Sequence, residues 1–234
     1  MMLKVTPILC RAGKMDNYAY LLQDSSTLTA AVLDASEAVP IIAECKKQNV
    51  KPQFLFNTHH HFDHVEGNLE LKQLYNAKIV GSAVDSKRIE GMDICLDDGD
   101  VFDLGDSQAK IIEADGHTIG HILWYFPKDK VLFTGDTLFN LSIGGLFEGT
   151  PEQMWHTLQK IKKLPDDVLF YPGHEYTAYG LYSLNGLPAQ IYAEKAKRRL
   201  AQGLPAGPFT LGEEKVCNPY LSASNLAEFW NLIK

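Results

Sequence analysis

Short apolar segments recur through the first 175 residues, and this repetition limits the possible folds more than any other property of the chain. Aliphatic and aromatic residues dominate these segments, and Gly and Asp separate them, which is typical of β-strands. Several are almost continuously apolar, as expected for strands that are buried on both faces. The predicted strands are residues 17–22, 28–35, 53–58, 109–114, 121–126, 130–135 and 167–173.

Helical patterns lie between the strands. Ser36 is expected to cap a helix over residues 37–48. Residues 150–153 (TPEQ) have the order of a capping box, with Pro at the first helical position. The apolar residues that follow at helical spacing are expected to pack in the core: Met154, Trp155, Leu158 and Ile161.

The composition changes after about Tyr176. Residues 188–202 are predicted to form a helix that stops at Gly203, and a loop region is expected to lead to an amphipathic stretch at residues 225–234. We therefore predict the α/β class, with a catalytic domain over residues 1–175 and a small helical subdomain over residues 176–234.

Charge and cysteine content exclude several classes of protein. Lys and Arg number 22 against 29 Asp and Glu, a net charge of -7, which argues against a general nucleic-acid or anionic-membrane binder. The four cysteines include no C-x-x-C pair, so reduced thiols are expected. No stretch reaches the ~20 apolar residues of a membrane span, and the apolar run at residues 5–9 is short for a signal peptide. A cytoplasmic protein, which we expect to be a monomer, fits these features.

The sequence THHHFDH, residues 58–64, directly follows a predicted strand and places four His and one Asp within six positions. Imidazole nitrogens and carboxylate oxygens are ligands of borderline divalent metals. Ligands spaced in this way can point in two directions from one turn. The segment is therefore predicted to serve a metal site and could serve two ions.

Three further residues follow predicted strands, and each comes directly after a glycine: His117, Asp136 and His174. Glycine lets the backbone turn and approach closely where a ligand must be aimed. We expect these side chains to converge with the THHHFDH segment. His60 is expected to point away from the metals, His121 to be structural or to support a ligand, and His156 to be unrelated.

The motifs DNYAYLL, THHHFDH, GHTIGH, FTGDTLF, LFEGT, PGHEYT and NPYL together resemble the metallo-β-lactamase superfamily, and within it the glyoxalase II (hydroxyacylglutathione hydrolase) family. They span almost the whole chain in the family's order. The resemblance implies an αββα sandwich, a C-terminal helical subdomain that binds substrate, and a two-metal site.

The resemblance also implies roles for individual residues. One metal would be held by His59, His61 and His117, and the other by Asp63, His64 and His174, with Asp136 bridging both. Zinc is the expected metal, and iron or manganese would also fit. A metal-bound hydroxide would attack the thioester of S-D-lactoylglutathione or a related S-(2-hydroxyacyl)glutathione. No side chain acts as nucleophile, and Asp63 and Asp136 are the catalytic residues expected to orient the hydroxide.

The chain differs from the family at the residues that bind glutathione. Gly145 stands where relatives carry Lys or Arg, Phe147 stands at the aromatic position, and Ser222 follows Leu221 where an Arg is usual. Tyr176 is retained. We expect a weakened preference for glutathione, with substrate contacts from Gly145, Leu146, Phe147 and Tyr176.

Two alternatives remain at this point: a thioesterase for another thiol carrier and a mononuclear-iron persulfide dioxygenase. Metal stoichiometry and oxygen consumption would separate the dioxygenase from a hydrolase. A flavodiiron protein would have Glu at the position of His61, and the charge disfavours a nuclease. A β-lactamase would carry an export signal, and a non-enzymatic binding module would lack some of the ligands.

Overall fold

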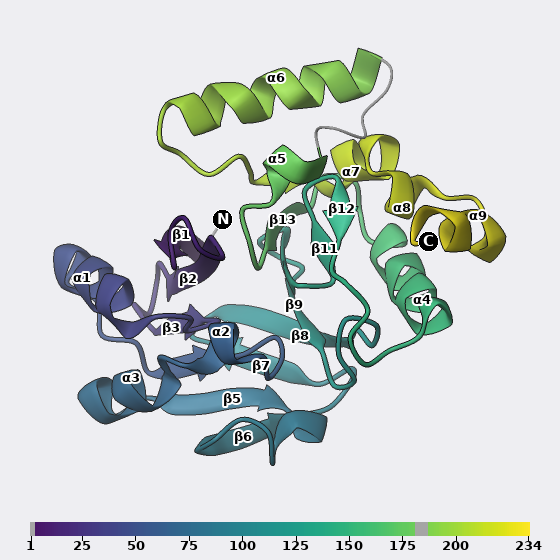
Figure 1. Ribbon diagram of the computed structural model, residues 1–234. Coiled ribbons are helices and arrows are strands. Elements are labelled where there is room, and N and C mark those ends of the chain that lie inside the picture. The colour runs from purple at the N-terminus through teal and green to yellow at the C-terminus, as the bar shows by residue number, and fades with distance from the viewer. Residues whose placement is uncertain (1–2, 181–186) are drawn as a thin grey trace. The chain divides into compact units, whose positions relative to one another are not determined.

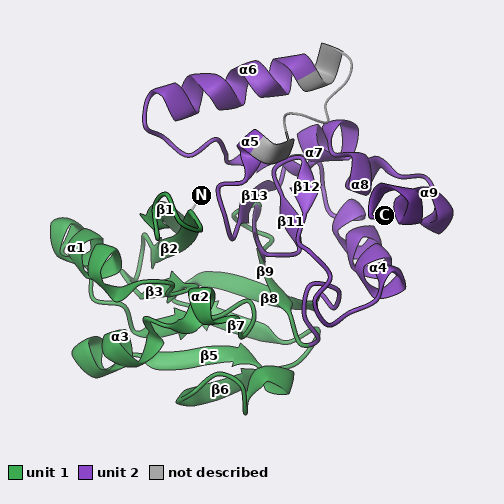
Figure 2. Ribbon diagram, in the orientation of Figure 1, with its two compact units in different colours: residues 1–113, 120–130 green, residues 114–119, 131–234 purple. Residues whose placement is uncertain are grey.

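The computed structural model (Figure 1) describes residues 3–180 and 187–234. Figure 2 shows that the chain forms two compact units. Unit 1 comprises residues 1–113 and 120–130, and unit 2 comprises residues 114–119 and 131–234. These units are defined by their compactness. The predicted division at residue 175, between a catalytic domain and a substrate-binding subdomain, is a separate matter and stays a prediction.

Unit 1 contains a six-stranded sheet whose strands lie in chain order. Strands β1 to β3 are antiparallel and β3 to β6 are parallel, so helices must carry the chain between the later strands. The strands are β1 (Leu3–Cys10), β2 (Asn17–Asp24), β3 (Ala30–Leu33), β4 (Phe54–Phe56), β5 (Lys78–Ser82) and β6 (Met92–Leu96). The crossovers contain α1 (Ala38–Gln48), α2 (Phe62–Val65), α3 (Asn68–Tyr75) and the 3-10 helix η1 (Ala83–Asp85).

Three antiparallel strands complete unit 1: β7 (Val101–Leu104), β8 (Ser107–Glu113) and β9 (Ile122–Phe126). They meet β4 through aromatic rings, because Phe56 stacks on Trp124 with ring centroids 4.1 Å apart and Phe102 lies edge-on to Phe56 at 5.1 Å. The Trp124 indole N–H donates to the carbonyl of Asn57 at 3.2 Å. This packing fixes the end of β4, where the THHHFDH segment begins.

Unit 2 places β10 (Val131–Gly135) parallel to β13 (Leu169–Pro172), with β14 (Phe209–Thr210) antiparallel to β13. A short hairpin follows β10 and consists of β11 (Leu138–Phe139) and β12 (Ser142–Ile143). The helices are α4 (Pro151–Lys162), α5 (Thr177–Gly180), α6 (Leu187–Ala201), α7 (Leu211–Cys217), α8 (Pro219–Ser222) and α9 (Leu226–Leu232). Helices α4 and α9 lie side by side in Figure 1 and join through Trp155 and Phe229, whose ring centroids are 5.6 Å apart.

Most of the predicted elements are confirmed. The seven predicted strands correspond to β2, β3, β4, β8, β9, β10 and β13, and the predicted helices correspond to α1, α4, α6 and α9. Gly203 has a φ of 69° just after α6, as its predicted role as a helix stop requires. In the part of the chain that the structure describes, no helix combines the length and apolar character needed to cross a bilayer.

Two local predictions were wrong. Ser36 does not cap α1: the N-cap is Glu37, without a side-chain cap, and the Ser36 hydroxyl instead accepts from Arg11 Nε at 3.1 Å. The region after residue 203 is not only loop, because α7 begins with a second capping box, formed by Thr210 and Glu213. Asn218 then caps α8.

The capping box of α4 is present as predicted. The Thr150 hydroxyl accepts from the Gln153 backbone N–H at 3.3 Å, and the Gln153 side chain accepts from the Thr150 N–H at 2.8 Å. Thr150→Ala removes one of these partners, so we expect the free energy of unfolding to fall by about 1 kcal/mol. Urea denaturation of the two proteins measures this change. Equal stability would mean that the cap contributes nothing.

A buried carboxyl group connects α7 to its neighbours in unit 2. Burial raises the pKa of Glu214 to about 7 from an ordinary value of 4.5, although hydrogen bonds from Tyr192, Asn218 and Leu141 oppose the rise. The folded chain therefore holds this proton more tightly than the unfolded chain does. Its contribution to stability is full below pH 4.5 and is lost as the pH rises through about 7.

This linkage predicts a pH-dependent difference between the wild type and Glu214→Gln. Relative to that variant, the wild type should lose about 3 kcal/mol of unfolding free energy between roughly pH 4.5 and 7. Urea titrations of both proteins across this range measure the difference, and comparing the two removes the contribution of every other titrating group. A difference that stays constant with pH would contradict the assigned pKa.

Candidate metal centre

In unit 1, the ligand-rich segment is anchored where it leaves β4. Asp34, at the end of β3, accepts from the backbone N–H and from the hydroxyl of Thr58, each at 2.8 Å. Asp34 and Thr58 are both buried. The carboxylate thus fixes the residue that directly precedes His59.

Asp34 also orients His64 on α2. His64 Nδ1 lies 3.0 Å from Asp34 Oδ2, and because the carboxylate accepts, Nδ1 carries the hydrogen. His64 Nε2 then carries the lone pair, and it lies 3.6 Å from Asp63 Oδ2. An imidazole held by a carboxylate on its far nitrogen is the usual arrangement of a metal-binding histidine.

Asp63 is held by Asn17 of the DNYAYLL motif. The Asn17 side-chain amide donates to the Asp63 carbonyl at 3.1 Å and to Asp63 Oδ2 at 2.9 Å. Both residues are buried. Sequence reasoning gave Asn17 and Asp34 no role, although both stand beside strand ends, as the predicted ligands do.

The remaining histidines of the segment have different neighbours. His59 and His61 have ring centroids 4.7 Å apart, and one ring nitrogen of each lies within 4.8 Å of the other. His60 turns to another partner, because its Nδ1 lies 3.4 Å from the buried carboxylate of Asp85. His121 stacks on His59 at 4.8 Å and therefore packs against a predicted ligand.

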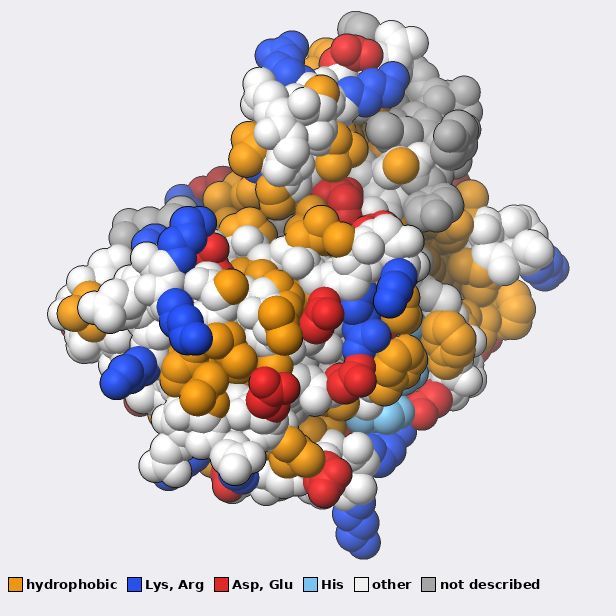
Figure 3. All heavy atoms as spheres, turned by 60° about the vertical axis from the view of Figure 1, so that its left-hand side comes forward, with side chains coloured by type: hydrophobic (Ala, Val, Ile, Leu, Met, Phe, Trp, Pro, Cys, Tyr) orange, Lys and Arg blue, Asp and Glu red, His pale blue; other side chains and the backbone are white. Residues whose placement is uncertain are grey.

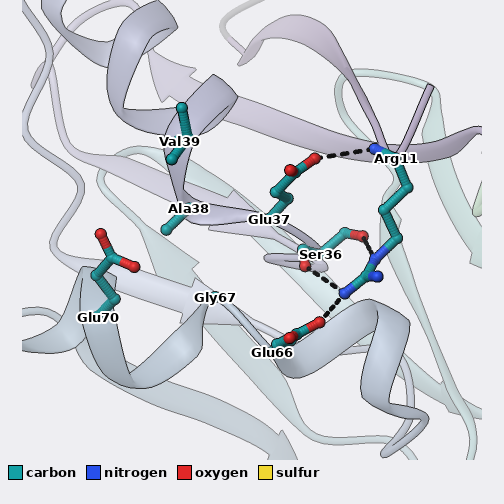
Figure 4. A pocket seen from close by; sticks show the side chains of 8 residues that line it. All are labelled: Arg11, Ser36, Glu37, Ala38, Val39, Glu66, Gly67 and Glu70. Carbon is teal, nitrogen blue, oxygen red and sulfur yellow. Dashed lines mark hydrogen bonds and ion pairs between the residues drawn. The ribbon is translucent and has the colours of Figure 1, made fainter.

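A pocket at the end of α2 is drawn in Figure 4, where Arg11 reaches toward Glu66 and Ser36. Arg11 forms an ion pair with Glu66, and its guanidinium carbon lies 5.3 Å from the centroid of the Phe62 ring. Its backbone N–H donates to Glu37 at 3.0 Å. Arg11 thus contacts both ends of α2, the helix that carries Asp63 and His64.

In unit 2, three predicted ligands meet at one carboxylate oxygen. Asp136 Oδ2 lies 3.5 Å from His117 Nε2 and 3.2 Å from His174 Nε2. All three side chains are buried. One oxygen facing two imidazoles suits a carboxylate that is shared between metal ions.

The backbone of residues 144–145 orients His117. His117 Nδ1 donates to the Gly145 carbonyl at 2.7 Å, which leaves the Nε2 lone pair on the side of Asp136. Gly144 permits this approach, because a Cβ there would overlap the Asp136 carbonyl oxygen and lie 2.9 Å from His117 Nδ1. The segment that lacks the family's basic residue therefore supports a predicted ligand through its backbone.

Aromatic rings lie against the histidines of unit 2. Tyr176 stacks on His174, with centroids 4.6 Å apart and planes 14° from parallel, and Phe147 lies edge-on to His117 at 5.1 Å. Phe147 is nevertheless 73% exposed. Of the predicted substrate residues, Phe147 and Tyr176 therefore adjoin predicted ligands, Gly145 binds one through its carbonyl, and Leu146 is partly buried.

Each unit offers donors suited to divalent ions. Unit 1 presents imidazoles and the Asp63 carboxylate, and unit 2 presents two imidazoles around Asp136. The side chains of Asp63, His64 and His117 are held by hydrogen bonds with an amide, a carboxylate and a carbonyl group, respectively. Imidazole and carboxylate groups held in this way fit divalent metal ions. On the face shown in Figure 3, acidic, basic and apolar side chains are interspersed, so charge of one sign does not dominate it.

Curated proteins resemble this chain over most of its length. The model of the Metallo-beta-lactamase superfamily matches residues 13–174. Hydroxyacylglutathione hydrolase from Pelagibacter ubique (strain HTCC1062) is 40% identical over 222 residues, which are 93% of either chain. The protein of the same name from Rhodobacter capsulatus is 42% identical over 233 residues, 97% of this chain and 90% of its own.

Solved structures share the fold at lower identity. ETHE1 from Myxococcus xanthus matches with a TM-score of 0.76 and 22% identity, covering 98% of this chain and 89% of its own. TTHA1623 in a di-iron-bound form has a TM-score of 0.67 and 22% identity, covering 92% and 99%. The metallo-β-lactamase fold, an αββα sandwich with a helical C-terminal region, is thus confirmed, and the chain belongs to the hydroxyacylglutathione hydrolase family of the metallo-β-lactamase superfamily.

Proposed function

We propose that the chain hydrolyses thioesters of 2-hydroxy acids, such as S-D-lactoylglutathione, at a centre of two divalent metal ions. Full-length similarity to hydroxyacylglutathione hydrolases, with every ligand position of the family filled, carries this proposal. One ion would be held by His59, His61 and His117, the other by Asp63, His64 and His174, with Asp136 shared.

The two ions would lower the pKa of a shared water toward neutrality and polarise the thioester carbonyl. The chain's own contribution is orientation. Asn17 holds Asp63, and Asp34 and the Gly145 carbonyl hold His64 and His117, so the donor atoms need little rearrangement to act. Asp63 and Asp136 are the proposed orienting carboxylates for the attacking oxygen.

Zinc is the proposed metal, with iron or manganese as substitutes in the same donor set. The proposed partner is a small-molecule thioester, and residues 176–234 are proposed to help bind it. We further propose that the protein acts as a monomer in the cytoplasm. Elemental analysis of the purified protein tests the metals, and an absence of oxygen consumption would separate hydrolysis from persulfide oxidation.

A thioesterase for another thiol carrier is the second candidate, and Gly145 favours it. A charge-assisted hydrogen bond to a carboxylate contributes roughly 1.5–3 kcal/mol, so the loss of two would weaken glutathione binding by about 10²–10⁴-fold. Steady-state hydrolysis of S-D-lactoylglutathione and of an acyl-coenzyme A, with metal content recorded, tests both candidates. A low KM for the glutathione thioester favours the first candidate, and better turnover of the other carrier favours the second.

Gly145→Lys should restore part of the grip on glutathione. We expect the KM for S-D-lactoylglutathione to fall by about tenfold or more, because one charge-assisted bond is regained. A Cβ at this position would lie 3.3 Å from the Phe147 ring, so the ring must move slightly. Gly145→Ala is the matched control, since it adds the Cβ without the charge. Equal KM values for the two variants would rule out a missing cation as the cause of weak binding.

A further inference from the structure

The buried carboxylate of Glu214 on α7 reaches the hairpin that follows β10. It accepts from the Leu141 backbone N–H, with its two oxygens 3.0 and 3.3 Å away. It also accepts from the Tyr192 hydroxyl and, at 2.9 Å, from the Asn218 amide. Glu214, Asn218 and Leu141 have exposures of zero and Tyr192 is 2% exposed, so water does not compete for these bonds.

Asn218 holds two more backbone groups of the same hairpin. Its amide donates to the Ser142 carbonyl at 3.1 Å and to the Phe139 carbonyl at 3.4 Å. Its side-chain oxygen caps α8 at the same time. Asn218 belongs to the NPYL motif, to which the proposed reaction gives no task.

The hairpin needs support from outside. Each of its strands has two residues, and such a short ladder is only marginally stable by itself. Leu141, in its turn, has a φ of 66°, a backbone conformation that costs energy for a residue with a side chain. The contacts from α7 and Asn218 supply this support at Phe139, Leu141 and Ser142, while Thr134 and Thr177 hold Leu138 and Asn140.

The hairpin connects two parts of the proposed metal centre. It begins two residues after Asp136, and it ends at Ile143, directly before the Gly144–Gly145 pair. The Gly145 carbonyl is the hydrogen-bond partner of His117. A shift of the hairpin therefore moves the group that orients His117.

We propose that Glu214 and Asn218 are positioning residues, which hold the β11–β12 hairpin so that the Gly145 carbonyl orients His117 for metal binding. The inference rests on the proposed function only in taking His117 as a ligand. It gives the helical C-terminal region a role in loading the metal in addition to the proposed contact with substrate.

Glu214→Gln tests the proposal, because it keeps the size of the side chain. Its amide nitrogen replaces an oxygen that accepts from the Leu141 N–H and from either Tyr192 or Asn218, so donors face each other there. Its matched control is Glu213→Gln, on the same helix, which removes the capping-box carboxylate and the ion pair with Lys195 but no contact with the hairpin. Zinc affinity is measured by competition with a chromophoric chelator at pH 8, at a temperature where circular dichroism shows both variants folded. The kcat and KM for S-D-lactoylglutathione are measured separately.

We expect Glu214→Gln to weaken zinc binding by about tenfold or more, and Glu213→Gln to stay within about twofold of the wild type. Folded Glu214→Gln with wild-type zinc affinity would overturn the inference. If Glu214→Gln does not fold, Asn218→Ser decides by the same criterion, since serine can cap α8 but cannot reach the hairpin carbonyls. A wild type that binds zinc but cleaves no thioester would refute the proposed function, while the affinity comparison would still test this inference.

Discussion

Replacing Asp136 with alanine is expected to abolish metal binding and thioester hydrolysis together. Its Oδ2 faces both His117 and His174 in unit 2, so the substitution removes a proposed metal-ligand atom that lies beside both imidazoles. Because a bound metal supplies several kcal/mol of transition-state stabilisation, the rate should fall by at least about 10³-fold. Metal per chain and turnover of S-D-lactoylglutathione are measured on the same sample.

Asp106→Ala serves as the control, because this exposed aspartate of unit 1 accepts a hydrogen bond from the Ser26 hydroxyl and lies apart from every proposed ligand in the sequence. It should keep the wild-type metal content and rate. An Asp136→Ala protein that retains two metals and full turnover would refute the assignment of Asp136 as the shared ligand.

The second large effect is expected from Asp34→Asn, a nearly isosteric change. Asparagine can keep one oxygen toward the Thr58 N–H, but its amide group then faces His64 Nδ1. Two donors cannot pair, so His64 must move its hydrogen to Nε2 and loses the lone pair that would bind metal. We expect metal affinity to fall by about 10–100-fold.

Asp129→Asn is the matched control, since Asp129 is another buried aspartate of unit 1 that accepts from a backbone N–H, that of Leu3, at 2.9 Å. Chelator competition gives the metal affinities, and urea unfolding gives the stabilities of both variants. If the two variants lose stability alike and neither loses metal affinity, Asp34 only supports the fold.

The sequence indicated the proposed ligands because each follows a strand and a turn, a pattern that local residue types encode. It did not indicate their supporting partners. Asn17 and Asp34 lie 46 and 30 positions before the residues that they hold, and such pairings depend on how β2 and β3 are placed in the sheet. Only the three-dimensional fold brings these residues together.

The wrong local predictions have similar causes. Ser36 has the right chemistry for a helix cap, but the Arg11 guanidinium, from 25 positions earlier, takes its hydroxyl. The helix α7 follows a Gly- and Pro-rich segment in the sequence. That segment is typical of a loop, so the Thr210–Glu213 capping box after it was missed. Gly145 was interpreted only through the side chain that it lacks, whereas its role in unit 2 belongs to its carbonyl.

The use of a main-chain carbonyl to hold His117 has a consequence for how this protein can diversify. Every amino acid brings the same carbonyl, and Gly145 does not occupy the left-handed conformation that only glycine adopts easily. Under the proposed function, substitutions at position 145 would alter which thiol carrier is accepted while the support of His117 is retained. Its neighbour Gly144 has no such freedom, because any side chain there would collide with the backbone of Asp136. Selection for new substrates would thus act at position 145, while Gly144 keeps the close backbone approach to Asp136 and His117.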